Sequence, residues 1–465
     1  MALPAMREVH GKMPQQHRLE GPVPEIEGGR GGEWQGTRCD PYEDGHDQVH
    51  RIRDATERDD KEAPGDGPVE TGRPRGDNQD NRKEQEEEKM NRVYDACGIA
   101  ALFNIDGKPV EGKQIADMIR LQKERENGLG AGFAAHGIFP KHEDDYCIQL
   151  ILEEVPGKAP TKQRVEEYLN AHTDVIFDEE VPIRETERIR EPPQIWRFFV
   201  NTKREDADEH IKDVVMHVNS TIDGAFCMSS GKNMAVFKGN GWAADIAEFY
   251  RIDEMKAFMW SAHSRFPTNT PGWWGGAHPF NILGTSVVHN GEITSYGTNV
   301  NYLEERGYQC MLRTDTEVLA YIVDYIIRRS GYPKGIVHQI ATTAIAPPYW
   351  RDINLMSPER KRWMNYIRQT YRSALANGPF SIVITTDDPE PTMIAHTDRK
   401  KLRPMIAAYD GDSNTFYCAS ELSSIRTVCD TGDYWQPNPG VPVIVSKEGI
   451  KTRGTGEVFE GVNLG

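Results

Sequence analysis

Several features that mark particular protein classes are missing from this chain of 465 residues. No run of about 18 apolar residues or more occurs, and the first residues lack the apolar core of a signal peptide, so neither a membrane span nor secretion is indicated. The seven cysteines are scattered, and no Cys-x-x-Cys pair is present. That pattern argues against a disulfide framework, a zinc ribbon or an iron–sulfur ligand set. We therefore expect a cytoplasmic protein that is not associated with a membrane.

Positive charge is also in short supply, because 55 Lys and Arg residues face 72 Asp and Glu residues, for a net charge of −17. This balance argues against a general nucleic-acid binder, which needs a basic surface. Neither a GxGxxG loop nor a P-loop is present. The usual signatures of dinucleotide and nucleoside triphosphate binding are therefore missing as well.

The first 89 residues are poor in apolar side chains. They contain no Phe, about 20% hydrophobic residues, 12 Gly, 8 Pro and a net charge of −8. Such a segment cannot bury enough apolar surface to offset the entropy lost on ordering, so we predict a disordered extension over residues 1–89. The rest of the chain is about 41% hydrophobic, which is ordinary for a globular protein. We interpret Met90 as the working start; a natural disordered tail is the alternative.

After Met90 the hydrophobic pattern predicts a mixture of strands and helices. Predicted strands cover residues 98–103, 196–200, 225–229, 234–237, 258–263, 285–289, 380–385, 393–396, 405–409, 415–418 and 441–445. Predicted helices cover residues 114–126, 207–218, 300–306, 316–328 and 358–376. Many strands occur in pairs with helices at intervals, and this favours an α+β sandwich over a regular βαβ sheet. The Gly-rich run 128–132 follows a predicted helix, and we interpret it as tight backbone packing beneath a site.

Four short motifs carry residues suited to chemistry. They are Tyr94-Asp95-Ala96-Cys97-Gly98-Ile99, His263-Ser264-Arg265-Phe266-Pro267-Thr268, His289-Asn290-Gly291-Glu292-Ile293 and Arg313-Thr314-Asp315-Thr316-Glu317. Each has an ordinary structural explanation when taken alone: a small core cysteine, a surface arginine, a hairpin turn, and a helix whose N-cap is Asp315. Together, and in this order, they resemble the class II glutamine amidotransferases.

The resemblance implies a fold and a set of roles. The fold would be the four-layer αββα sandwich of the N-terminal nucleophile hydrolases. Cys97 would attack the side-chain amide of glutamine, with its own α-amine as general base, since a free α-amine has a pKa of about 7.7–8.0. Asn290 and the backbone N–H of Gly291 would hold the oxyanion. Arg265 would bind the substrate α-carboxylate and Asp315 its α-ammonium, with Thr268 assisting by analogy.

A free amine on Cys97 requires a cut between Ala96 and Cys97, so the chain as written would be a precursor. The predicted organisation is then a disordered extension over 1–89, a short propeptide over 90–96, a class II amidotransferase domain over 97–450 and a C-terminal tail over 451–465. The extension falls outside the family pattern.

Other features indicate which amidotransferase the chain resembles. Cys97 and Arg265 are 168 residues apart, a longer interval than in the phosphoribosylpyrophosphate and glucosamine-6-phosphate members and similar to that of glutamate synthases. The tail resembles the glutamate synthase pattern in Asp398-Arg399-Lys400-Lys401-Leu402-Arg403-Pro404, followed by Ala419-Ser420-Glu421. Two further segments, 124–133 and 347–350, look most like stand-alone archaeal-type glutamate synthase amidotransferase subunits.

Signatures of the other synthases are missing. Asp387-Asp388 comes closest to the paired acids of a phosphoribosyl-diphosphate site, but Pro389-Glu390-Pro391 follows in place of a Thr/Gly loop. The Ser-Gly-Gly-x-Asp-Ser loop of asparagine synthetase does not occur. We expect no cofactor in this chain, with FMN and iron–sulfur clusters on partner subunits.

Three functions remain open. The first is a glutaminase subunit that hydrolyses glutamine and delivers ammonia to a separate, FMN-dependent glutamate synthase subunit acting on 2-oxoglutarate. The second is the related subunit of an N-methylglutamate synthase. The third is a non-catalytic interaction subunit, which intact Cys97, Arg265, Asn290 and Asp315 disfavour.

Overall fold

The computed structural model describes residues 97–266 and 272–459. The predicted extension over 1–89, the predicted propeptide over 90–96 and Thr268 lie outside the described residues.

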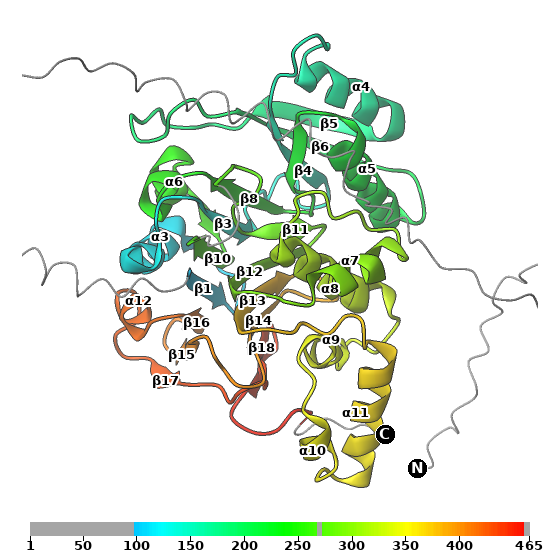
Figure 1. The fold of residues 1–465 in the computed structure, drawn as a ribbon. Helices are drawn as coiled ribbons and strands as arrows, with labels where there is room; N and C mark the ends of the chain where they lie inside the picture. Colours follow the sequence, from blue (N-terminus) through cyan, green and yellow to red (C-terminus); the bar gives the residue numbers. More distant parts are fainter. Residues whose placement is uncertain (1–96, 267–271, 460–465) are drawn as a thin grey trace, which may run out of the picture. The chain divides into compact units, whose positions relative to one another are not determined.

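Within the described residues, two large antiparallel sheets pack face to face (Figure 1). The seven-stranded sheet has the order β17 (Asp433–Trp435), β15 (Ile406–Asp410), β16 (Thr415–Ala419), β1 (Gly98–Asn104), β10 (Met259–Ser264), β3 (Ala131–His136), β8 (Met234–Gly239). The six-stranded sheet has the order β11 (Phe280–Ile282), β12 (Thr285–Gly291), β13 (Phe380–Thr386), β14 (Thr392–Thr397), β18 (Val443–Ser446), β19 (Gly449–Arg453).

Strand β1 is apolar on both faces because both faces are covered. Its odd-numbered residues, such as Ile99 and Phe103, meet Val288 and Val383 of the other sheet in the layer between the two. Its even-numbered residues, such as Leu102, face the outer helices. Successive side chains of a strand point to opposite faces, so an uninterrupted apolar run is what a central strand of a covered sheet requires.

Helices form the two outer layers. On the seven-stranded sheet lie α3 (Gly112–Arg120), α6 (Ala243–Phe249) and α12 (Leu422–Arg426). On the six-stranded sheet lie α8 (Asp315–Arg329) and α9 (Val337–Ile345). Outside them, α7 (Tyr296–Glu304) packs on α8, α11 (Pro358–Thr370) on α9, and α10 (Trp350–Ile353) on α11. Helix, sheet, sheet and helix follow one another, which confirms the predicted α+β, four-layer αββα sandwich of the N-terminal nucleophile hydrolases.

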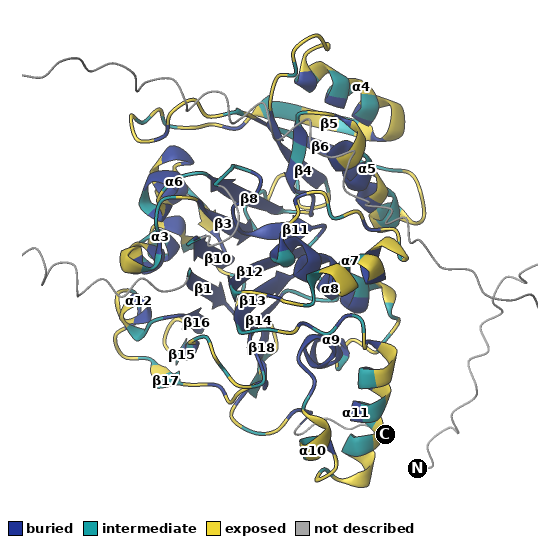
Figure 2. Cartoon of the chain, viewed as in Figure 1, coloured by how far each residue is buried: buried dark blue, intermediate teal, exposed yellow. Residues whose placement is uncertain are grey.

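A smaller sheet is appended to this sandwich. Among the described residues it has the order β5 (Asp174–Glu180), β6 (Gln194–Asn201), β4 (Tyr146–Leu152), β7 (Ala225–Ser229), and it packs with α4 (Thr161–His172) and α5 (Ala207–Thr221). The short strands β2 (Val110–Glu111) and β9 (Lys256–Ala257) pair separately. The sandwich strands are largely buried, whereas α4, α10 and α11 expose long faces (Figure 2). No helix in the described ranges is both long and apolar enough to cross a bilayer.

Several helix limits and one domain boundary differ from the sequence prediction. The helix predicted over 114–126 ends at Arg120, followed by a separate 3₁₀ turn, Lys123–Arg125. The helix predicted over 300–306 begins already at Tyr296. The helix predicted to reach residue 376 ends at Thr370. Beyond it, the Ala376 N–H donates to the Ile345 carbonyl instead of to a carbonyl one turn earlier in the same helix. The tail predicted from residue 451 begins inside β19, whose residues to Arg453 pair with β18.

Candidate active site

Cys97, the first residue of the described chain, immediately precedes β1 at one end of the sandwich. Its neighbour Gly98 pairs with Ser264 of β10, and the Cys97 Sγ accepts a hydrogen bond of 3.3 Å from the backbone N–H of Phe266. Burial raises the pKa of the Cys97 thiol, while the Phe266 hydrogen bond and the nearby Arg265 guanidinium act in the opposite direction. The cysteine of the first motif therefore lies directly beside the arginine of the second.

Arg265 follows the last residue of β10 and is almost fully buried. Its backbone N–H donates to the Gly130 carbonyl at 2.9 Å, and an added Cβ on Gly130 would lie 3.3 Å from its Cδ. The predicted tight packing of the Gly-rich run is therefore observed, and it holds the arginine. Burial lowers the pKa of Arg265, and the charges of Cys97 and Asp315 oppose that shift. The planar guanidinium of Arg265 can bind a carboxylate through two parallel hydrogen bonds, close to Cys97 and Asp315.

Asn290 and Gly291 end β12, beside the same end of the sandwich. Asn290 is fully buried, and among the described residues neither atom of its side-chain amide has a hydrogen-bond partner. Gly291 has a φ of +146°, and a Cβ there would lie 1.9 Å from the Pro379 carbonyl oxygen, so only glycine fits. Asn290 therefore presents a side-chain amide without a partner among the described residues. Next to it, Gly291 has a backbone conformation that only glycine can adopt.

Asp315 is the first residue of α8, and the helix cap is Thr314, whose Oγ1 accepts from the Glu317 N–H at 3.1 Å. The reading of Asp315 as an N-cap is therefore wrong. Instead, its Oδ2 accepts from the backbone N–H of Ile293 at 2.9 Å, which ties it to the segment after Gly291. Burial works against ionisation, but His289 and the hydrogen bonds from Ile293 and Thr316 hold the pKa of Asp315 below its usual value.

Two motifs that had been used only for family assignment hold the reactive strands in place. Ser420 accepts from the Ile99 N–H at 3.1 Å, and its own N–H donates to the Ile99 carbonyl at 3.0 Å. Gln122 adds a bond of 2.8 Å to the same carbonyl. Asp398 accepts from the backbone N–H groups of Phe380 and Leu402, at 3.1 and 2.9 Å, and Phe380 pairs with Gly291.

Sequence reasoning missed two buried charges near the site. The Nζ of Lys238 donates to the carbonyls of Gly275 and Pro279 at 3.0 and 3.2 Å, and burial lowers its pKa to about 7. Glu317 accepts from the N–H groups of Met311 and Leu312, and burial raises its pKa to about 7. Both brace backbone next to a motif. The available signals were a lysine inside an apolar strand and the last residue of the fourth motif.

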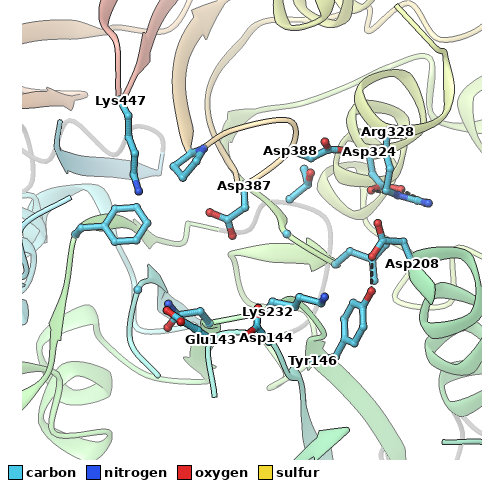
Figure 3. A pocket seen from close by; sticks show the side chains of 17 residues that line it. Glu143, Asp144, Tyr146, Asp208, Lys232, Asp324, Arg328, Asp387, Asp388 and Lys447 are labelled. Atoms are coloured by element: carbon cyan, nitrogen blue, oxygen red, sulfur yellow. Dashed lines mark hydrogen bonds and ion pairs between the residues drawn. The ribbon is translucent and has the colours of Figure 1, made fainter. Parts of the chain in front are cut away.

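A cavity of about 460 Å³ lies at the opposite end of the sandwich (Figure 3). Six carboxylates and three cations line it. Two of the carboxylates have close partners: Asp324 pairs with Arg328 at 2.9 Å, and Asp387 contacts His136, behind the cavity wall, at 2.9 Å. None of the four motif residues lines this cavity. Among the residues that the structure describes, no group of three His, Cys, Asp or Glu side chains is arranged to hold a metal.

The four motif residues that the structure describes meet at one place. Cys97, Arg265, Asn290 and Asp315 come from three strand ends and one helix start, far apart in the sequence and at the same end of the sandwich. Thr268 lies outside the described residues.

Comparison with known proteins identifies the family. Residues 141–430, more than half of the chain, match the model of the class II glutamine amidotransferases; this span contains Arg265, Asn290 and Asp315 and begins after Cys97. An uncharacterised protein of Archaeoglobus fulgidus is 43% identical over 359 residues, which cover 76% of this chain and 92% of the relative.

More distant relatives are named enzymes. A glutamine–fructose-6-phosphate aminotransferase (isomerizing) of Pyrobaculum aerophilum is 28% identical over 39% of this chain and 29% of its own length. Among solved structures, the glutamine phosphoribosylpyrophosphate amidotransferase of B. subtilis is 16% identical, with a TM-score of 0.40 over 79% of this chain and 50% of that one. On the strength of the family match, the chain belongs to the class II glutamine amidotransferases.

Proposed function

We propose that this chain hydrolyses glutamine to glutamate and ammonia with Cys97 as the nucleophile. The observation that carries the proposal is the position of the Cys97 Sγ, next to Phe266 and within electrostatic range of both Arg265 and Asp315. A zwitterionic amino acid held between a guanidinium and a carboxylate has its side chain fixed in direction, which lets the enzyme hold the amide carbon at the thiol.

The proposed reaction has two steps. The thiolate forms a bond to the amide carbon, and the carbonyl electron pair moves onto oxygen, where Asn290 and the N–H of Gly291 stabilise it. When that pair returns, the C–N bond breaks, and ammonia leaves with the proton that the Cys97 α-amine took from the thiol. Water then attacks the thioester by the same route, releasing glutamate and restoring Cys97. Thr268 assists substrate binding in this scheme.

A free α-amine requires that the mature protein begin at Cys97. Intact-mass measurement of active protein tests this directly. An active species that still carries Ala96 would contradict the base assignment. Translation from Met90 should leave folding unchanged, since residues 1–89 contain about 20% hydrophobic residues.

We infer further that ammonia goes to a separate, FMN-dependent synthase subunit that aminates 2-oxoglutarate in the cytoplasm, with FMN and iron–sulfur clusters on partner subunits. The long interval before Arg265 and the motifs around Asp398 and Ser420 support this proposal, because they follow the glutamate synthase pattern. An N-methylglutamate synthase would carry similar motifs and is the alternative.

Coupling in a reconstituted complex tests the proposal. Cys97→Ala removes the nucleophile, while ammonia supplied directly makes glutamine hydrolysis unnecessary. The variant should lose glutamine-dependent glutamate formation and keep the ammonia-dependent reaction. If the isolated chain made glutamate from 2-oxoglutarate and ammonia, the separate synthase would be contradicted. Product formation that depends on methylamine would favour the alternative.

A further inference from the structure

Three buried histidines stand behind the candidate active site, one from each of three chain segments. His263 lies two residues before Arg265, and His289 directly precedes Asn290. The ring of His278 stacks on that of His263, with centroids 4.0 Å apart, and lies 6.4 Å from that of His289. The sequence motifs contain two of these residues, and the reaction proposed above uses none of them.

The hydroxyl of Thr316 joins this stack to Asp315. Its Oγ1 lies 3.1 Å from the His289 Nδ1, 3.3 Å from the His278 Nε2 and 3.2 Å from the Asp315 Oδ1. A hydroxyl has one proton to donate and two lone pairs to accept with. An ionised carboxylate can only accept, so the Thr316 proton goes to Asp315, and both imidazole nitrogens must donate to Thr316.

The remaining contacts agree with that assignment of protons. The His278 Nδ1, which then has no proton, accepts from the backbone N–H of His289 at 3.4 Å. The His263 Nε2 faces the His289 carbonyl at 2.9 Å and must donate to it. The two nitrogens left without a proton, Nδ1 of His263 and Nε2 of His289, are the two that have no partner among the described residues. One proton on each ring therefore satisfies every contact.

Burial keeps the rings of His263 and His278 neutral. It lowers the pKa of His263 to about 3 and that of His278 far below its usual range. A second proton on His263 or His289 would sit on the buried nitrogen for which the described residues offer no acceptor.

We propose that Thr316 and His278 are positioning residues, which fix the carboxylate of Asp315 and the oxyanion strand at His289 through a chain of single-proton hydrogen bonds among three neutral imidazoles. The proposal rests on the role of Asp315 as the ligand of the substrate ammonium. The chain links β10, β12 and α8, so the arginine, the asparagine and the aspartate of the site share one rigid support.

The first test measures the protons directly in the full-length protein. Nitrogen-15 NMR of the imidazoles at pH 7 should show His289 as the Nδ1–H tautomer, with the signal assigned by its loss in His289→Gln. Thr316→Val should change this tautomer, and Thr316→Ser should keep it. An Nε2–H tautomer of His289 in the wild type would overturn the proposal.

The second test separates positioning from general damage. Thr316→Val should raise the glutamine KM about tenfold, because two N–H groups and one carboxylate oxygen lose their partner. Thr316→Ser should stay within about twofold of wild type. The matched control is Thr342→Val, which removes another fully buried hydroxyl, in α9, away from the four motifs.

A substrate analogue shows whether the effect passes through Asp315. Glutaramate carries the same amide and carboxylate as glutamine but no α-ammonium. Thr316→Val should therefore raise the KM for glutamine much more than the KM for glutaramate. Equal losses for both substrates would indicate a structural role only and overturn the proposal. Wild-type protein that hydrolyses neither compound would contradict the proposed function instead, while the NMR result would still decide the proton positions.

Discussion

The two ends of the sandwich treat buried polar groups in different ways. At the end near Cys97, the amide of Asn290 is fully buried with no partner for either atom among the described residues. At the other end, the buried carboxylate of Asp324 is bonded by Arg328 at 2.9 and 3.0 Å and by the Tyr308 hydroxyl at 2.5 Å. Asn290 therefore leaves hydrogen-bonding capacity open, whereas Asp324 uses its capacity internally.

This difference separates a candidate reaction site from a charged cavity. A buried polar group without a partner costs about 1–3 kcal/mol, so retaining one is best explained by a ligand that completes it. The cavity at the far end is lined by six carboxylates and three cations, and its most buried carboxylate, Asp324, is already paired with Arg328 (Figure 3).

The largest expected effect is on stability at the far end. Arg328→Met leaves Asp324 buried without its cation, and breaking such a pair costs about 3–5 kcal/mol. Denaturant unfolding should show this loss, while the glutamine KM stays unchanged. Arg328→Met combined with Asp324→Leu should recover much of the stability. A double variant as unstable as the single one, or a changed KM, would contradict the view that this end is only structural.

The next largest expected effect is on kcat and comes from a variant at the site end. Asn290→Ala removes a side-chain donor to the oxyanion and should lower kcat by a factor of about 10²–10³, with little change in KM. Steady-state glutaminase kinetics measure both values. Asn104→Ala is the matched control, because Asn104 is also buried but lies at the far end of β1 and bonds Ser413 and Thr415. A similar loss of kcat in both variants would remove the distinction between the two ends.

Much of the candidate site could be read from the sequence because its residues occur in short motifs. What the sequence could not provide was the support beneath them. His278 and Lys238 act through contacts with residues far along the chain, and no local pattern encodes those contacts. Most sandwich strands were predicted, since two-sided burial gives continuous apolar runs.

Several elements were missed for physical reasons. Strand β3 consists mainly of small residues, including three alanines, which have no strong strand preference; pairing with β10 and β8 decides its conformation. Helix α9 is only nine residues long and is buried throughout, so it offers too short a pattern, without an exposed polar face, to identify it from the sequence. Strand β5 is mostly exposed and carries four acidic residues, which gives little strand signal.

A smaller effect, on the glutamine KM, should again distinguish the site end of the sandwich from the rest of the molecule. Arg265→Lys keeps the charge but loses the two-pronged geometry, so the glutamine KM should rise about 10- to 100-fold, as for the loss of a charge-assisted hydrogen bond. Glutamine titrations of the initial rate give the value. The control is Arg197→Lys, at a partly buried arginine paired with Glu179 in the appended sheet. An unchanged KM in Arg265→Lys would show that this residue does not hold the substrate carboxylate.

The smallest expected effect is a pH dependence of stability that comes from the site end. Glu126 caps the start of α6 by accepting from the Ala243 N–H at 2.9 Å, and burial, with Asp245 adding to it, raises its pKa from 4.5 to about 7. The unfolded chain gives up this proton near pH 4.5, whereas the folded chain holds it to about 7. Stability therefore falls as the pH rises through this window and levels off above it.

Glu126→Gln should remove this dependence, because the amide oxygen can still accept from Ala243 and carries no proton to lose. Each unit of pKa is worth about 1.4 kcal/mol, so the free energies of unfolding of variant and wild type should diverge between pH 4.5 and 7 by on the order of 2 kcal/mol. Denaturant unfolding at a series of pH values measures the divergence, with the exposed Glu205→Gln as control. Curves that stay parallel would mean that Glu126 is ionised in the folded protein at neutral pH. The contrast between the two ends would then rest on Asn290 alone.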